Sequence, residues 1–157
     1  MKIDRGDLQR VKAELGKFER TADKKFFSEI GMFIAHRIKE RTVEQGKDAD
    51  GSAFKPYSPR YKLFRESLGL PTKPDLFLTG TMMGAMAYDA TDTRLKVFMN
   101  RTTNPSTIGS GKKKKKLSQQ PSSAKAFWLH QERPFFRLNQ KDIDMIMDMF
   151  QKRLDSL

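Results

Sequence analysis

The stretch that decides the fold is residues 48–83, which read DADGSAFKPYSPRYKLFRESLGLPTKPDLFLTGTMM. Asp50-Gly51 is a turn signal, and the prolines of this stretch fix φ and remove backbone donors. A flexible linker would be rich in Gly, Ser or charge, but here large apolar residues recur: Phe54, Tyr57, Tyr61, Leu63, Phe64, Leu68, Leu70, Leu76, Phe77 and Leu78. The pattern predicts an extended, proline-rich arm over residues 47–78. This arm packs either on the chain's own core or on a neighbouring subunit.

Upstream of the arm, the spacing of apolar residues predicts a helical hairpin. The first helix, over residues 1–20, has an apolar stripe of Leu8, Val11, Leu15 and Phe18. The second, over residues 21–46, has a broader stripe of Phe27, Ile30, Ile34 and Ile38, flanked by Phe26 and Phe33. We expect Thr21 to cap this long amphipathic helix, Asp23 to lie in its first turn and Gly46 to end it.

Downstream of the arm, the hydrophobic period changes twice. Leu78, Met82 and Met86 lie four apart, which predicts a short helix that opens near Thr79 with the Thr hydroxyl as its cap. Alternation then predicts a β-hairpin from residues 86–90 and 95–99. Because two strands alone are marginal, we expect a further strand from residues 133–138 or from the arm.

The last third of the chain combines an irregular stretch with helices. Residues 101–123 show no period, and a loop of that length is usually functional or disordered. A short helix is expected over residues 124–131. A final helix over residues 139–155 is predicted with Asn139 as its cap, Asp142 in its first turn, and a buried stripe of Ile143, Ile146, Met147, Phe150 and Leu154. Met82, Met86 and Met147 are expected in the core, whereas Met83, Met145 and Met149 are candidates for a partner-facing surface.

Together these elements predict one α+β domain over residues 1–157. The N-terminal helical hairpin and the C-terminal helix would pack on a small, mainly antiparallel sheet, from which the proline-rich arm and a flexible basic loop over residues 101–123 would project.

Charge is the sharpest compositional feature. The formal net charge is +12, and the run Lys112–Lys116 alone supplies five of these charges in a loop without acidic residues. Two interpretations stay open. The run is a solvated tip, or its candidate contact residues, Lys112, Lys113, Lys114, Lys115 and Lys116, touch DNA phosphates or an acidic partner. No aromatic residues interleave with the lysines, so any DNA contact would be directed at the backbone and non-specific.

Several classes of function find no support in the sequence. The chain has no cysteine, which excludes disulfides and thiolate catalysis. His36 and His130 belong to separate segments, with no nearby Cys or His at the spacing of metal ligands. A calcium loop centred on Gly51 would need acidic residues where Gly46 and Tyr57 stand. No signal peptide or membrane span is apparent. We therefore expect neither an enzyme nor a cofactor, and no membrane partner.

Four short motifs occur in order: DG-x-x-FKPYSP-x-Y from Asp50, L-x-LTG-x-M-x-x-x-M from Leu76, FWLHQ from Phe127 and RPFF from Arg133. Over roughly residues 25–155 the chain thereby resembles the phage virion morphogenesis (tail completion) family of the head–tail neck. It departs from the family pattern where Phe54 stands in place of Trp. It also departs where Glu132 alone separates His130-Gln131 from Arg133-Pro134.

The resemblance implies a structural virion protein at the neck or tail end, assembled in the host cytoplasm. It implies a homo-oligomeric ring, commonly hexameric, that meets portal-side connector or stopper proteins and tail tube proteins, with possible non-specific contact with genomic DNA. Candidate residues of the assembly arm are Phe54, Pro56, Tyr57, Tyr61, Leu78 and Gly80. A packing motif is expected at Trp128, His130, Arg133, Pro134 and Phe135. The alternative is a small, basic, non-specific DNA-binding protein whose functional element is the lysine run.

Overall fold

The fold is built around one long helix, α2 (Lys24–Lys39), which continues as a π-helical turn, η1 (Glu40–Glu44). The computed structural model describes residues 9, 16, 23–109 and 114–156, so the helix expected over residues 1–20 lies outside the described residues. Asp23 caps α2 by accepting a hydrogen bond from the Phe26 amide, rather than lying in the first turn. The predicted stripe is confirmed at Ile30, Ile34 and Ile38, which are buried. At its start it runs through Phe26, expected only as a flank, whereas Phe27 is partly buried.

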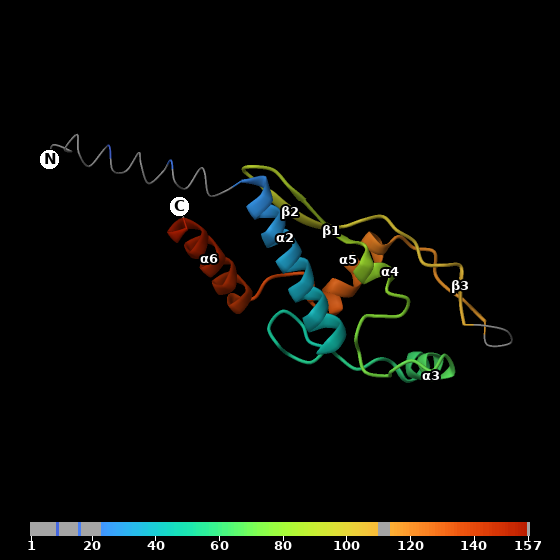
Figure 1. Cartoon of the computed structure of the whole chain (residues 1–157). Coiled ribbons are helices and arrows are strands. Elements are labelled where there is room, and N and C mark those ends of the chain that lie inside the picture. The colour runs from blue at the N-terminus through green and yellow to red at the C-terminus, as the bar shows by residue number, and fades with distance from the viewer. Residues whose placement is uncertain (1–8, 10–15, 17–22, 110–113, 157) are drawn as a thin grey trace.

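One side of α2 is covered by an antiparallel hairpin of β1 (Met86–Ala90) and β2 (Leu95–Met99), as predicted (Figure 1). The approach is close, since a Cβ added to Gly31 would lie 2.7 Å from the Tyr88 ring. The prediction that residues 133–138 add a third strand to this sheet is wrong. Residues 133–138 form no strand, and Pro134 has no N–H to donate to a ladder.

The 101–123 stretch is not uniformly irregular, contrary to prediction. Thr107–Ile108 (β3) pairs with Lys115–Lys116 (β4) in a second small antiparallel sheet. This sheet extends away from α2 at the end of the molecule opposite α6 (Figure 1). The described part of the chain is thus α+β, with two separate two-stranded sheets.

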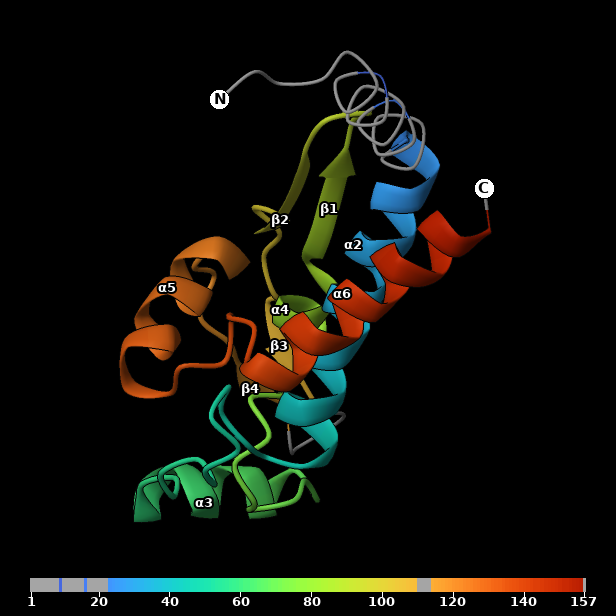
Figure 2. The ribbon, with the colours of Figure 1, turned by 90° about the vertical axis from the view of Figure 1, so that its left-hand side faces the viewer.

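Helix α6 (Gln140–Asp155) crosses α2 on the side away from the hairpin (Figures 1 and 2). Its start was predicted correctly, because Asn139 and Asp142 form a reciprocal capping box. The predicted stripe is partly wrong, since Met147 is 62% exposed and Ile143 is also exposed. The reason is that Asp142 turns inward, so that Ile146, Met149 and Phe150 follow it onto the core.

The structure confirms two of the predictions for the methionines and contradicts two others, besides Met147. Met82 and Met86 are buried as expected, and Met145 is exposed. The surface position expected for Met83 and Met149 is wrong, because Met83 is only 3% exposed and Met149 packs against the core.

The predicted extended arm contains a helix, α3 (Pro59–Ser67). Ser58 caps it by accepting from the Tyr61 amide, and Pro59 occupies the first turn, where a missing N–H costs nothing. The turn at Asp50-Gly51 forms as predicted, closed by Asp48 Oδ1, which accepts from two backbone amides. Phe54 is buried in the chain's own core, so the arm folds back on the molecule.

Two short helices complete the fold. α4 (Thr81–Gly84) follows Gly80, whose φ of 76° is in the left-handed region, and the Thr79 hydroxyl accepts from the Thr81 amide at 3.4 Å. The helix expected over residues 124–131 is α5 (Ser122–Glu132), which contacts α4 and β2. Among the described residues, no helix is long and apolar enough to cross a membrane.

Candidate functional site

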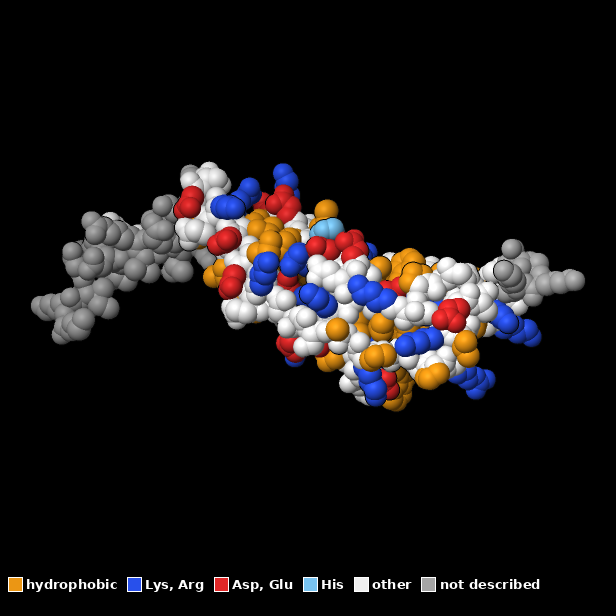
Figure 3. Space-filling model, turned by 90° about the horizontal axis from the view of Figure 1, so that it is seen from below, with side chains coloured by type: hydrophobic (Ala, Val, Ile, Leu, Met, Phe, Trp, Pro, Cys, Tyr) orange, Lys and Arg blue, Asp and Glu red, His pale blue; other side chains and the backbone are white. Residues whose placement is uncertain are grey.

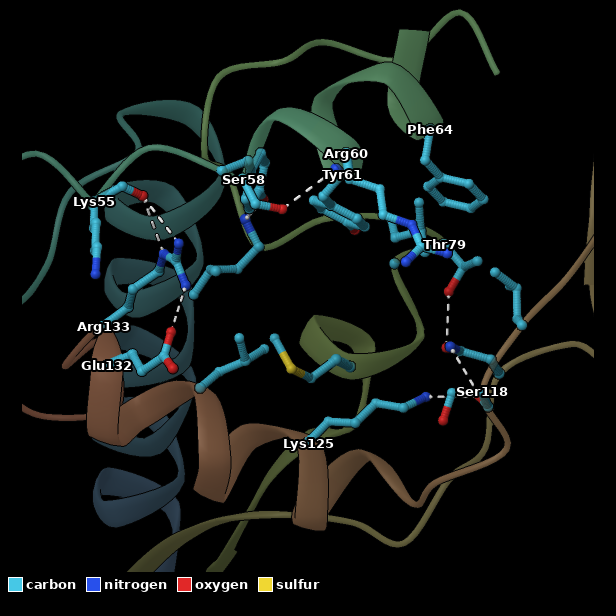
Figure 4. Close-up of a pocket in the computed structure, with 18 of the residues that line it drawn as sticks. Lys55, Ser58, Arg60, Tyr61, Phe64, Thr79, Ser118, Lys125, Glu132 and Arg133 are labelled. Atoms are coloured by element: carbon cyan, nitrogen blue, oxygen red, sulfur yellow. Dashed lines mark hydrogen bonds and ion pairs between the residues drawn. The ribbon is translucent and has the colours of Figure 1, made fainter. Parts of the chain in front are cut away.

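A large open hollow lies between α3, the segment 76–82, α5 and the strand β4 (Figure 4). We call it the α3–α5 groove. Its volume is about 830 Å³, which is in the range of protein binding sites. It is lined by Lys55, Pro56, Tyr57, Ser58, Arg60, Tyr61, Phe64, Leu76, Leu78, Thr79, Gly80, Met82, Asn104, Lys116, Leu117, Ser118, Lys125, Leu129, Glu132 and Arg133.

One wall of the groove is formed by residues 47–78, the predicted arm, and a buried polar cluster around Tyr57 stabilises it. The Tyr57 hydroxyl donates to Asp75 Oδ1 (3.2 Å) and accepts from the amides of Asp75 (3.2 Å) and Leu76 (3.0 Å). Arg65 reaches the same carboxylate at 2.8 Å, and its guanidinium lies 5.1 Å from the centre of the Tyr57 ring. Burial raises the pKa of Tyr57, so the phenol stays protonated and donates.

Arg133, which follows α5, joins the wall of the groove formed by α5 to the wall around Tyr57. Its guanidinium donates from Nε (3.3 Å) and from a terminal nitrogen (3.0 Å) to the carbonyl of Lys55, and lies 5.6 Å from the centre of the Tyr57 ring. Tyr57 therefore lies between two arginines, Arg65 behind it and Arg133 across from it. These contacts join the segment just before α3 to the end of α5.

The interior of the groove is apolar and rich in aromatic rings. Tyr57 and Tyr61 meet edge to face at 4.8 Å, and Tyr61 stacks on Phe64 at 5.8 Å. Leu76, Leu78, Met82 and Leu129 complete the apolar lining. Such a surface is poorly hydrated, and it favours apolar side chains of a bound partner.

The rim of the groove is basic. Lys55, Arg60, Lys116 and Lys125 line it together with Arg133, and Glu132 is the only acidic residue among the lining residues. The Lys125 ammonium donates to the carbonyl of Ser118 at 3.2 Å, and partial burial lowers the pKa of Lys125. Figure 3 shows hydrophobic side chains interspersed with Lys and Arg over this end of the molecule. The groove is suited to a ligand that is apolar and negatively charged.

The structure brings together residues that the sequence placed in separate motifs. Five of the candidate assembly residues line the groove, namely Pro56, Tyr57, Tyr61, Leu78 and Gly80, whereas Phe54 is buried in the core and does not line it. Lys116 is on the rim, Lys114 and Lys115 are not among the lining residues, and Lys112 and Lys113 lie outside the described residues.

The candidate packing motif is divided between core and surface. Phe135 is fully buried, Pro134 accepts a backbone hydrogen bond from Ala49, and His130 Nδ1 accepts from the Phe136 amide at 3.2 Å. The expected packing role is wrong for Trp128, whose side chain is 61% exposed beside Phe127. Ala126 and Leu129 form the face of α5 that packs on the core, and Phe127 and Trp128 lie on the opposite, exposed face.

Sequence analysis missed Arg65, Asp75 and Lys125. One signal was available for Arg65, because a helix from Pro59 places it four residues after Tyr61 and on the same face. No comparable signal marked Asp75 or Lys125, since their roles depend on segments that the fold brings near. Within the described ranges, no cluster of His, Asp or Glu could hold a metal ion.

Comparison of the chain with protein-family models, with curated proteins and with solved structures finds no match.

Proposed function

We propose that this chain is a structural protein of a tailed phage or prophage, which forms a ring in the neck and either completes the tail or joins it to the head. The observation that carries the proposal is the convergence of separate motifs on one open surface. Tyr57 and Tyr61 from the first motif, Leu78 and Gly80 from the second and Arg133 from the fourth all line the α3–α5 groove.

An assembly role is a better account of this groove than a catalytic one. The titratable side chains that line it are five lysines and arginines, two tyrosines and one glutamate. No histidine is among the lining residues. The tyrosine at its centre is engaged by Asp75 and two backbone amides, and its raised pKa does not favour a nucleophilic phenolate. An apolar surface with a charged rim is instead the usual anatomy of a protein interface.

In this role the chain would act as a homo-oligomer, with six copies as the number that the family resemblance implies. Its neighbours would be the portal-side connector or stopper proteins on one side and tail tube proteins on the other. The site of action would be the virion neck. The role requires no cofactor.

Assembly of particles in the absence of this chain tests the proposal. We expect filled heads together with separate, overlong or unfinished tails, all distinguishable by negative-stain electron microscopy. Supplying the wild-type chain should restore joined particles. Normal infectious particles made without it would contradict the proposal.

Non-specific DNA binding is the second candidate, favoured by the exposed Lys114–Lys116 segment, which β3 and β4 hold away from the core. Residues 101–123 contain no acidic side chain that could neutralise the run. If all five lysines contact phosphates, the salt dependence of DNA binding should have a slope of roughly −0.9 per contact.

Changing Lys112–Lys116 to Gln should flatten that slope and leave the fold intact, as measured by DNA affinity over a range of salt concentrations and by a thermal melt. If DNA affinity is unchanged while docking to an acidic neck protein is weakened, the run is a protein contact. If both are unchanged, the run is a solvated tip.

A further inference from the structure

Helix α6 leaves one face uncovered in the described structure. Its inward side carries Asp142, Ile146 and Met149, so the residues half a turn away face outward. Met147 is 62% exposed and Ile143 is 42% exposed. Asp144 and Asp148, next to them in sequence, are exposed as well. This outer α6 face therefore presents apolar side chains beside carboxylates.

The carboxylates of the outer α6 face are only lightly engaged within the chain. Asp144 accepts from the Gln140 side chain at 2.8 Å, and the same type of contact joins Gln151 to Asp155. The Asp148 side chain has no hydrogen bond or ion pair to the described residues. Lys141, three residues before Asp144, and Lys152, four residues after Asp148, lie beside these carboxylates on the side of the helix away from Met147. The carboxylates therefore form an acidic stripe between Met147 and the two lysines.

The outer α6 face and the α3–α5 groove are complementary in two respects. Apolar Ile143 and Met147 match the aromatic interior formed by Tyr61 and Phe64, and Asp144 and Asp148 match the basic rim. A carboxylate brought to the rim would also compensate for the burial of the Lys125 ammonium.

The two surfaces lie at opposite ends of the molecule. Figure 1 shows α6 on one side of α2, whereas α3, α5 and β3 lie on the other. In the view of Figure 3 most acidic side chains lie over the half of the molecule opposite the groove end. One copy cannot bring its own α6 into its own groove, but two copies can meet head to tail. Such a heterologous contact repeats from copy to copy and closes into a ring when the rotation permits.

We propose that helix α6 of a second copy docks in the α3–α5 groove, with Ile143 and Met147 on the aromatic interior and Asp144 and Asp148 on the basic rim. This inference rests on the proposed function and names the contact between neighbouring copies of the ring. The segment 1–22 is a poorer occupant, because its sequence carries more basic than acidic residues and would be repelled by the rim.

Charge reversal tests the contact. The helix variant carries Asp144→Lys and Asp148→Lys, and the groove variant carries Arg60→Glu and Lys125→Glu. Each variant alone should self-associate roughly tenfold more weakly than the wild-type chain, or weaker still, because like charges then meet. A control with Lys47→Glu and Lys62→Glu makes the same change in net charge outside the groove and should associate like the wild type.

Mixing the two variants provides the decisive result. In an alternating assembly, the basic α6 of one variant meets the acidic groove of the other, and the unchanged α6 meets the unchanged groove. Association should therefore return on mixing, as measured by sedimentation up to millimolar concentration. Thermal melts of each variant show that the monomer is folded. Association that is unaffected by either reversal, or that does not return on mixing, would overturn the α6–groove contact.

A crosslinking experiment reports the same contact independently of charge. The chain has no native cysteine, so Met147→Cys with Phe64→Cys gives each copy one thiol on α6 and one in the groove. Oxidation should then produce a ladder beyond dimers, whereas each single variant should stop at a dimer. A wild-type chain that never self-associates, with a double variant that gives no ladder, would overturn the inference. The particle experiment above judges the neck function separately, since joined particles can depend on this chain through a different contact.

Discussion

Two buried arginines hold two regions of this molecule in different ways. Arg41, on η1, pairs with Asp142 at 2.7 Å across 101 residues of sequence, and so joins the end of α2 to the start of α6. Arg65, on α3, pairs with Asp75 at 2.8 Å across only ten residues. The first pair therefore fixes the global arrangement of helices, whereas the second shapes one wall of the groove.

The two arginines also differ in how completely they are bonded. Arg65 directs Nε and both terminal nitrogens to the carbonyls of Pro71 and Phe77 and to Asp75. Arg41 bonds Asp142 and nearby carbonyls through its terminal nitrogens, but its buried Nε has no partner among the described residues. The hydrogen-bonding capacity of the Arg65 guanidinium is therefore used at all three nitrogens, whereas that of the Arg41 guanidinium is not. We expect disruption of the first pair to destabilise the whole fold and disruption of the second to loosen only the groove.

The largest effect should come from Asp142→Ala. The Asp142 side chain is fully buried, and its removal leaves the Arg41 charge buried without a counterion. Breaking such a pair should lower the free energy of unfolding by about 3–5 kcal/mol, as measured by urea denaturation. Asp148→Ala on the exposed side of the same helix is the control and should change it by less than about 0.5 kcal/mol. Equal effects would mean that the pair does not organise the fold.

The same pair predicts the behaviour in acid. Burial alone would raise the pKa of Asp142, but hydrogen bonds from Arg41 and from the Asn139 amide outweigh burial, so its pKa is lowered below the ordinary 3.8. As the pH falls, the unfolded chain therefore takes up this proton first. The stabilisation is complete above pH 3.8 and is lost as the pH drops from that value toward the folded pKa.

Unfolding measured between pH 6 and 2 should accordingly show stability falling in acid, with a shallower fall in the Asp142→Asn variant. Parallel curves for the two proteins would show that another carboxylate controls the acid transition.

Asp75→Ala should have an intermediate and local effect. Arg65 retains two carbonyl acceptors, so the loss is that of charge-assisted hydrogen bonds, about 1.5–3 kcal/mol. Residues 71–78 should lose protection in hydrogen exchange before α2 and α6 do. If protection fell evenly over the chain, the distinction between the two arginine clusters would be lost.

Periodicity was sufficient to predict the elements whose burial follows from local spacing. The stripe of α2, the β1–β2 pairing and the capping box of α6 were all predictable, because each depends on residues near one another in sequence. The orientation of α6 was not, since Asp142 turns inward only because Arg41 meets it from 101 residues away. Helix α3 was not predicted, because a stretch rich in proline favours extended backbone, whereas Pro59 occupies the first turn of α3, where proline is well tolerated.

The candidate site was predictable to a similar degree. Tyr57, Tyr61 and Leu78 could be identified as anchors from size and apolar character alone. The basic rim could not, because Arg60, Lys116 and Lys125 come from three elements, and only the fold places them around one groove. Trp128 was misplaced for the opposite reason, since a large aromatic residue usually indicates packing but here lies on the outer side of α5.

The smallest predicted effect concerns Thr42, beside Arg41 in η1. Its side chain is fully buried, and its hydroxyl has no hydrogen-bond partner among the described residues. Thr42→Val replaces that hydroxyl with a methyl group of the same shape, and Val and Thr have similar helix propensities. Removing an unsatisfied buried hydroxyl should raise the free energy of unfolding by about 1 kcal/mol.

Thr42→Ser is the matched control, because it keeps the hydroxyl and loses the methyl group. It should lower the free energy of unfolding by about 1 kcal/mol. Urea denaturation of the three proteins decides the matter. A Val variant less stable than the wild type would mean that the hydroxyl is hydrogen-bonded after all, and that the cluster around Arg41 is as saturated as the one around Arg65.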